Sequence, residues 1–230
     1  MSTVLTPQST VAEVQTALAE LEDPRMRAVN EKHGDDLGVN LSKLRGLAKA
    51  LKSNQELAQR LWATGETATR LVAILICKPR MFSLDDLERW LREARTPKVQ
   101  GWFVNYVVKK SKHLEDLRKL LMHDSDPVVA SAGWELTAHQ VVKAPENLEL
   151  AQLLDIVEAE MKTAPDRMQW AMNNTLAQIG IEHEPLRSRA LQIGEDLQVL
   201  ADYPTPPGCT SPFAPIWINE MVSRKSTSQQ

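Results

Sequence analysis

Cysteine and long apolar stretches are scarce in this chain of 230 residues. Its two cysteines, Cys77 and Cys209, are too few for a disulfide framework, so we interpret both as structural thiols in a reduced compartment. The N-terminus lacks the basic and apolar regions of a signal peptide, and no apolar run approaches the roughly 20 residues of a membrane span. We therefore expect a monomeric cytoplasmic protein that does not contact membranes.

Motifs for metal and nucleotide chemistry are also missing. The five histidines are scattered, without a cysteine partner or an HExxH pattern, which argues against a zinc site. The segment "ATGET" at 63–67 lacks the lysine and the spacing of a phosphate-binding loop, and there is no GxSxG motif. We expect neither a metal nor a cofactor.

The formal net charge of −3 argues against a general nucleic-acid coat protein, because affinity for phosphates comes from concentrated Lys and Arg. Charge is unevenly distributed, however. Basic residues gather in 43–52 and 107–119, while acids dominate 146–160. Such runs are usually solvated helix faces. The alternative is that they form a local basic surface.

Apolar residues recur at three- and four-residue spacing between short breaks, and only nine glycines occur. This pattern is typical of an all-α protein. We predict helices over 9–22, 24–33, 41–52, 54–63, 66–77, 84–95, 98–111, 113–122, 127–142, 147–162, 166–180 and 184–199. Ser83, Asp126 before Pro127, and Asp166 after Pro165 mark predicted helix starts.

Short connections between these helices favour antiparallel pairs stacked as an α-solenoid. The segment "HDSDPVVASAGWELTAHQVV" is similar to the second helix of a HEAT-type repeat. Trp102, Trp134 and Trp170 fall in successive second helices, at intervals of 32 and 36 residues. They predict a ladder at equivalent positions.

The C-terminal stretch differs in composition. Five prolines lie between 204 and 215, which favours extended or turn conformations. Tyr203, Phe213 and Trp217 are candidates to hold it against the last helices. We predict one HEAT-like-repeat domain over 1–200, a Pro-rich cap over 201–222 and a disordered tail over 223–230.

Several phrases resemble the AlkD-like DNA alkylation repair family, whose members are built of HEAT-like repeats. They are "HGDDLGVNLSKLRGLAKAL", "ELAQRLWATGETATRLVAILICKP", "SAGWEL" and "APDRMQWAMNNTLAQIG", spread over about residues 20–200. The resemblance implies a protein that binds double-stranded DNA in a basic concave groove. It also implies release of purines with a cationic N3 or N7 alkyl group, by an Asp and flanking Trp rings that stabilise positive charge on the sugar.

Carried over residue by residue, the resemblance places the family's first Trp on Gly101 and its Asp on Asn105. The DNA-contacting Arg falls on Ser131, and the second Trp falls on Asn174. The catalytic carboxylate is therefore replaced by a neutral amide, which cannot match its effect beside an oxocarbenium-like centre.

Helical geometry suggests what replaces these groups. Val99, Trp102, Phe103, Tyr106 and Val107 form one apolar stripe, which we expect in the core. A second, polar stripe holds Gly101, Asn105, Lys109 and Lys112, and a later helix brings Arg167, Trp170, Asn174 and Gln178 together. We expect Arg45, Gly101, Lys109, Lys112, Ser131, Trp134 and Arg167 to contact DNA.

Trp170, with Trp134, is a candidate to replace the missing ring contacts near Asn105 and Asn174; the alternative is that all three ladder tryptophans are core residues.

Three functions follow. The preferred one is recognition of damaged or distorted DNA with little or no glycosylase activity. The others are an active glycosylase with a rearranged site, and a helical-repeat adaptor that binds protein on its concave face.

Overall fold

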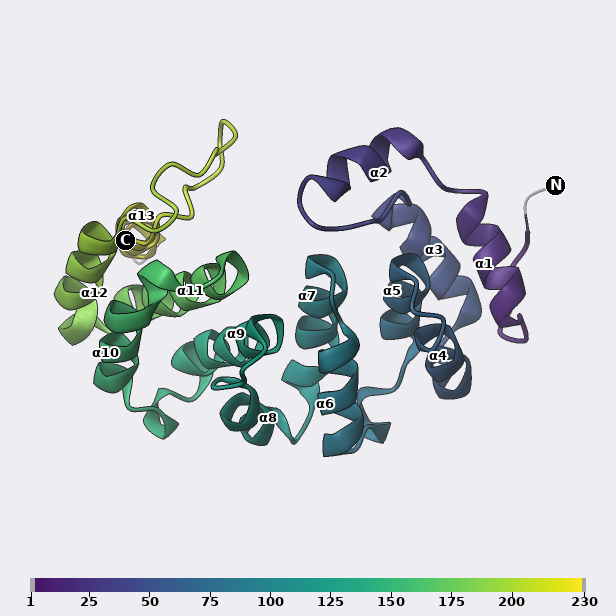
Figure 1. Ribbon diagram of the computed structural model, residues 1–230, viewed down its shortest axis with the longest axis horizontal. Coiled ribbons are helices and arrows are strands. Elements are labelled where there is room, and N and C mark those ends of the chain that lie inside the picture. Colours follow the sequence, from purple (N-terminus) through teal and green to yellow (C-terminus); the bar gives the residue numbers. More distant parts are fainter. Residues whose placement is uncertain (1–2, 229–230) are drawn as a thin grey trace. The chain divides into compact units, whose positions relative to one another are not determined.

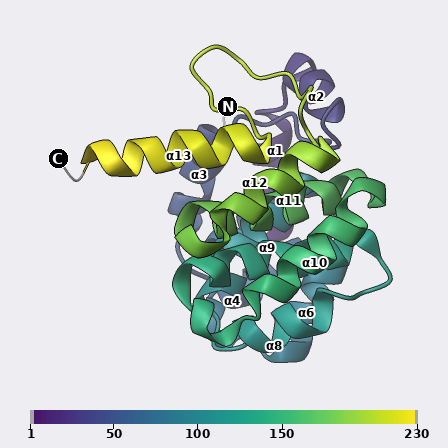
Figure 2. The same ribbon diagram turned by 90° about the vertical axis from the view of Figure 1, so that its left-hand side faces the viewer.

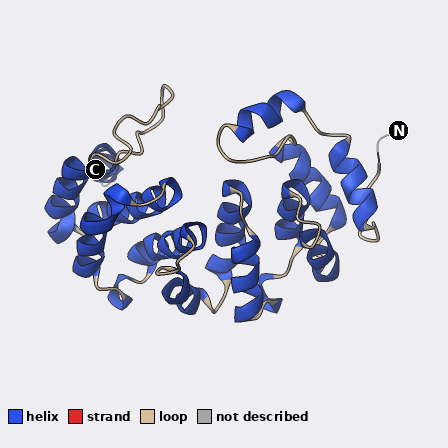
Figure 3. Ribbon diagram, in the orientation of Figure 1, coloured by secondary structure: helices blue, strands red, loops and turns tan. Residues whose placement is uncertain are grey.

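The computed structural model describes residues 3–228, and all regular elements in this range are helical (Figures 1 and 3). The all-α prediction is confirmed. The helices of the described range are α1 (Val11–Ala19), α2 (Pro24–Glu31), α3 (Leu41–Leu51), α4 (Gln55–Trp62), α5 (Thr67–Ile76), α6 (Leu84–Glu93), α7 (Pro97–Tyr106), α8 (Leu114–Leu121), α9 (Pro127–Lys143), α10 (Leu150–Glu160), α11 (Asp166–Glu182), α12 (Glu184–Leu197) and α13 (Ala214–Ser228). Short 3-10 turns lie at η1 (Pro79–Met81), η2 (Val108–Lys110), η3 (Pro145–Asn147) and η4 (Met161–Thr163).

Two predicted helix starts have the expected caps. The Ser83 hydroxyl accepts from the backbone N–H of Asp86, whose carboxylate accepts from Ser83 in return, which completes a capping box at α6. Asp126 caps α9 by accepting from the N–H of Val128, with Pro127 at the first helical position. In the described part of the chain, no helix is both long and apolar enough to cross a membrane.

Contacts divide the chain into two compact units, Met1–Leu114 and Glu115–Gln230. One repeat domain over 1–200 stays a prediction. The N-terminal unit has an aromatic centre. Trp62 and Trp90 stack with ring centroids 3.9 Å apart and planes inclined by 8°. Phe82 meets Trp90 edge-on at 4.8 Å, and Phe103 lies 5.5 Å from Trp62. These rings fasten α4, α6 and α7 to one another.

The C-terminal unit is centred on α9 and α11, which pack side by side (Figure 1). Gly133 permits the close approach of α9 to the end of α8. A Cβ at this position would lie 2.3 Å from the backbone nitrogen of Met122. The fully buried Trp134 and Leu176 fill the space between α9 and α11.

The chain end differs from the prediction. Residues 214–228 form α13 instead of a proline-rich coil and a disordered tail, and residues 229–230 lie outside the described range. Pro215 sits in the first turn of α13, where its missing N–H costs no hydrogen bond. Ile218 is fully buried against Gly180. Figure 2 shows α13 beside α12, with the preceding loop standing away from the helices.

Candidate nucleic-acid interface

Helix α7 has one buried and one open face, as its sequence predicts. Val99 and Phe103 are buried and anchor the helix. On the other face, Gly101 is half-buried and Asn105, one turn later, is exposed. A Cβ at Gly101 would meet no atom within 4 Å, so this face is open to a ligand.

Trp102 and Tyr106, expected in the core, are only half-buried. They form an edge-to-face pair with centroids 5.4 Å apart. The Arg45 guanidinium of α3 lies over the Trp102 ring, with Cζ 4.7 Å from its centroid and Nη2 3.5 Å from the Tyr106 hydroxyl. Because α3 meets these rings with a cation and not with an apolar side chain, they stay at the surface.

Asn105 is held in a short chain of hydrogen bonds. Its Nδ2 donates to the Gly101 carbonyl at 2.8 Å, and its Oδ1 accepts from Lys109 Nζ at 2.8 Å. Lys110 Nζ lies 5.9 Å from the Tyr106 ring centroid. The position that the family resemblance assigns to a carboxylate therefore carries an amide bonded to an ammonium group.

The elements that carry this surface contain basic and no acidic residues. Neither α3 nor the segment formed by α7 and η2 contains Asp or Glu. The basic residues of these elements are Lys43, Arg45, Lys49, Lys98, Lys109 and Lys110. Lys112 follows in the next loop and is exposed. We call the surface around Arg45, Trp102, Asn105, Tyr106 and Lys109 the α3–α7 surface.

Two residues expected to contact DNA lie in the core instead. Trp134 is 1% exposed and Ser131 is 3% exposed. The Ser131 hydroxyl donates to the Val128 carbonyl, and the Trp134 carbonyl accepts from the Thr175 hydroxyl. Both lie on the face of α9 that packs within the C-terminal unit, so neither reaches a ligand at the surface.

The tryptophan ladder is not a set of equivalent positions. Trp102 is half-buried beside a cation, Trp134 is buried in the core, and Trp170 is 39% exposed. Trp170 meets Tyr203 at right angles, with ring centroids 5.0 Å apart. The similar spacing failed as a guide because the three residues are the sixth of α7, the eighth of α9 and the fifth of α11, which are not equivalent positions.

Asn174 has an acidic neighbour that sequence reasoning missed. Its Nδ2 donates to Glu135 Oε2 of α9 at 3.0 Å, and its Oδ1 lies 3.5 Å from the Gln178 amide nitrogen. Arg167 is half-buried on the same helix. Glu135 is the only acidic residue in the α9 sequence, and a lone acid in a mostly apolar helix is the signal that points to it.

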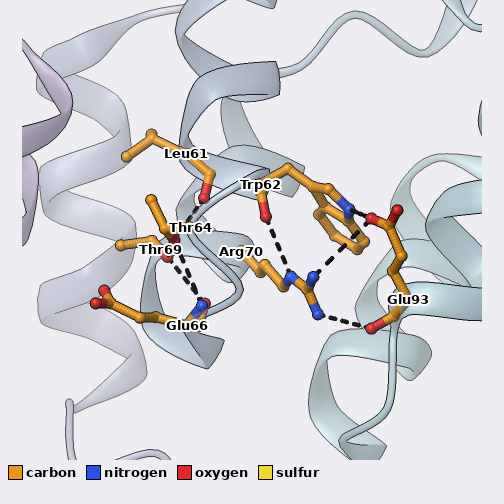
Figure 4. A network of polar contacts seen from close by, with 7 residues as sticks. All are labelled: Leu61, Trp62, Thr64, Glu66, Thr69, Arg70 and Glu93. Atoms are coloured by element: carbon orange, nitrogen blue, oxygen red, sulfur yellow. Dashed lines mark hydrogen bonds and ion pairs between the residues drawn. The ribbon is translucent and has the colours of Figure 1, made fainter.

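One phrase of the resemblance, around Trp62 and Arg70, has a structural role (Figure 4). Arg70 Nε donates to the Trp62 carbonyl at 3.2 Å, and its Nη1 donates to the Glu93 carbonyl at 2.6 Å. The Trp62 indole N–H donates to the Glu93 carboxylate. Burial lowers the pKa of the Arg70 guanidinium, and the Glu93 charge opposes this. The network joins α4, α5 and α6.

The two cysteines lie in different environments. Burial raises the pKa of the Cys77 thiol to about 12. Cys209 is exposed, in the loop before α13. Among the residues that the structure describes, no three His, Cys, Asp or Glu side chains gather in a group that fits a metal ion.

Comparison with known proteins shows which family this helical scaffold belongs to. A family model described as "DNA alkylation repair enzyme" matches residues 14–218. The chain belongs to the DNA alkylation repair enzyme family. The resemblance seen in the sequence is thereby confirmed.

The individual relatives of this family member have low sequence identity to it. "Uncharacterized protein Lmo0209" of Listeria monocytogenes serovar 1/2a (strain ATCC BAA-679 / EGD-e) is 22% identical over 198 residues, which cover 82% of this chain and 86% of the relative. A solved structure with a TM-score of 0.74 and 23% identity covers 94% of this chain and 95% of its own. It is described as "a new family of proteins related to the HEAT-like repeat DNA glycosylases with affinity for branched DNA structures". The likeness confirms the HEAT-like repeat fold.

Proposed function

We propose that this DNA alkylation repair family protein binds distorted DNA, branched DNA included, through the α3–α7 surface, and that it does not excise bases. The observation that carries the proposal is the contact of Lys109 with Asn105, 2.8 Å apart, at the position of the family's catalytic carboxylate. The branched substrate is suggested by the affinity described for the structural neighbour.

The α3–α7 surface has the chemistry of a phosphate-binding site. A guanidinium stacked on an indole keeps its N–H donors at its edge, where phosphate oxygens accept them. Arg45 has this arrangement over Trp102. Lysines such as Lys109 and Lys110 add charge, and the absence of a side chain at Gly101 lets a sugar-phosphate backbone come close.

Base excision is disfavoured by the same groups. Release of an alkylpurine builds positive charge on the sugar, which a carboxylate stabilises. Asn105 is neutral, and the Lys109 ammonium bonded to it repels a cation. The site is therefore suited to anionic phosphates and not to a cationic transition state.

The DNA-binding test is a fluorescence anisotropy titration of a fully paired four-way junction at several salt concentrations. Log affinity should fall linearly with log salt, with a slope of about 0.9 per phosphate contact. Arg45→Ala and Lys109→Ala should each weaken binding and reduce that slope by about one.

Matched controls are Arg89→Ala and Lys119→Ala, whose side chains are 58% and 68% exposed outside this surface. They should leave the slope unchanged. A slope near zero for the wild type would exclude phosphate-driven binding and would favour the protein-binding adaptor.

The excision test is release of N7-methylguanine from duplex DNA by the wild type, by Asn105→Asp and by Asn105→Asp combined with Lys109→Ala. We expect no release by the wild type. The double variant should be the most active, because removal of Lys109 frees the new carboxylate from an ion pair. Release by the wild type would refute the proposal.

One observation favours a second function, an active glycosylase with a rearranged site. Glu135 places a carboxylate 3.0 Å from Asn174, at the position of the family's second Trp. If the wild type releases base, Glu135→Gln should abolish the release. Release that survives Trp170→Ala would show that this ring does not replace the missing one.

A further inference from the structure

The loop before α13 lines one side of an open pocket within the C-terminal unit. Its volume is about 290 Å³, and its walls come from α11, from residues 203–212 of the loop and from α13. Asn173 holds the loop in place, because its amide is 1% exposed and donates from Nδ2 to the Pro212 carbonyl at 2.8 Å. Several prolines restrict the loop further. The Pro212 end of the loop is therefore fixed to α11.

Aromatic rings dominate the lining. Trp170, Tyr203 and Trp217 face the pocket from the three segments. Trp170 and Tyr203 are 39% and 40% exposed, which is unusual for large rings placed side by side in a soluble protein. Such rings offer surfaces on which a planar group stacks.

The polar groups of the lining are uncharged. Thr205, Thr210 and Ser211 contribute hydroxyls, and no residue of the lining carries a formal charge at neutral pH. Hydroxyls donate and accept, so they suit the mixed edge of a heterocycle. Arg224 lies next to the lining, with Nη2 3.4 Å from Thr210 Oγ1, and it is also paired with Glu220.

We infer that this pocket takes one unpaired nucleobase of a bound DNA. Its volume is at the small end of ligand pockets, which fits a single ring system and is too small for a folded peptide. Stacking on Trp170 and Tyr203 supplies affinity for any base, and the three hydroxyls contact its polar edge. The pocket thus recognises the unpaired nucleotides that occur where strands branch.

This inference rests on the proposed function and concerns a different set of residues, so the two can fail separately. The test compares a duplex carrying a flap of unpaired thymidines with the fully paired four-way junction. Both are branched, and only the first offers free bases.

Trp170→Leu and Tyr203→Leu should each lower affinity for the flap roughly tenfold, because stacking on one aromatic ring contributes about that factor. Affinity for the paired junction should not change, and neither should the salt slope, since the pocket holds no charge. Trp170→Phe, which keeps a ring, should retain most of the affinity. Leu120→Ala, at a side chain 47% exposed elsewhere in the unit, serves as control.

The outcomes separate the two ideas. Equal affinity of the wild type for flap and junction, with no effect of Trp170→Leu, overturns the inference and leaves the proposed function standing. An equal loss for both DNAs also overturns it. If the wild type binds neither DNA, both ideas fall.

Cys209 gives a second measurement that needs no substitution in the pocket. It belongs to the lining and is exposed, while Cys77 is buried. Alkylation of Cys209 by iodoacetamide should slow severalfold in the presence of the flap and not in the presence of the junction. An unchanged rate with saturating flap would contradict an occupied pocket.

Discussion

Asn105 and Glu135 show how far single residues can be interpreted before their neighbours are known. The family resemblance predicted that Asn105 stands where relatives carry a carboxylate, and this stays a prediction. The hydrogen bond from Lys109, which decides what this amide can do, depends on side-chain rotamers as well as on helical spacing. Glu135 could not be assigned to Asn174, because the two residues lie 39 positions apart on separate helices.

Glu115 and Arg118 form an ion pair whose contribution depends on pH. Arg118 is buried, and its Nε and Nη2 donate to the two Glu115 oxygens at 2.8 and 2.7 Å. These hydrogen bonds lower the pKa of Glu115 to about 2. A lowered pKa stabilises the folded state at pH values above the ordinary pKa of Glu, and the contribution is lost as the pH falls through about 2.

We expect Glu115→Gln to reduce the free energy of unfolding by about 1–3 kcal/mol at pH 7, because Arg118 keeps its charge and loses its partner. The difference from the wild type should shrink as the pH approaches 2. Urea denaturation at several pH values measures it. Glu88→Gln, in the more exposed pair with Arg92, should cost under about 0.5 kcal/mol, and an equal loss in both variants would contradict this account.

At the level of elements, twelve of the thirteen helices in the described range were predicted from spacing and caps, within a few residues at each end. The periodicity of buried positions is a local property, so the sequence reveals it. Helix α13 was missed because five prolines precede it or lie in its first turn and its tail is polar. Its stability comes from packing of Ile218 on α11, which is a tertiary effect.

Alanine substitution at two helical glycines should change the free energy of unfolding in opposite directions. Gly133→Ala should lower the free energy of unfolding by about 1–3 kcal/mol, because its Cβ would lie 2.5 Å from Met122 Cα and α9 must shift. Gly46→Ala in α3 should raise it by about 0.5–1 kcal/mol, since its Cβ meets nothing within 4 Å. Thermal unfolding of the two variants compares them directly. Similar effects at both sites would show that close packing at Gly133 does not matter.

For the molecule as a whole, a net charge of −3 coexists with the basic elements of the α3–α7 surface because the two signs are separated along the chain. All charged residues of α3 and α7 are basic, while α10 carries Asp155, Glu158 and Glu160. Uneven charge of this kind was visible in the sequence. The sequence could not show which basic side chains share a surface, because α3 and α7 are far apart in the chain.

Exposed acids outside the α3–α7 surface should slow association with DNA by long-range repulsion. Glu149→Lys with Glu160→Lys changes the formal net charge from −3 to +1. We expect this double variant to bind the four-way junction severalfold faster at about 20 mM salt, and equally fast at about 300 mM, where the Debye length is only a few ångströms. Stopped-flow anisotropy measures both rates. A gain that persists at high salt would mean that the new lysines contact DNA directly.

Because the tryptophans lie in different environments, their intrinsic fluorescence reports on different parts of the molecule. Trp62 and Trp90, stacked at 3.9 Å in the N-terminal unit, exchange excitation energy and emit from a dry interior. Trp170 in the C-terminal unit is exposed to solvent and emits at longer wavelength. The blue edge of the emission spectrum therefore reports on the N-terminal core together with buried Trp134, and the red edge reports on Trp170 and Trp217 of the pocket and on the half-buried Trp102 of the α3–α7 surface. In a Trp102→Phe background, a base that stacks on Trp170 quenches the red edge alone, so occupancy of the pocket can be followed without a label.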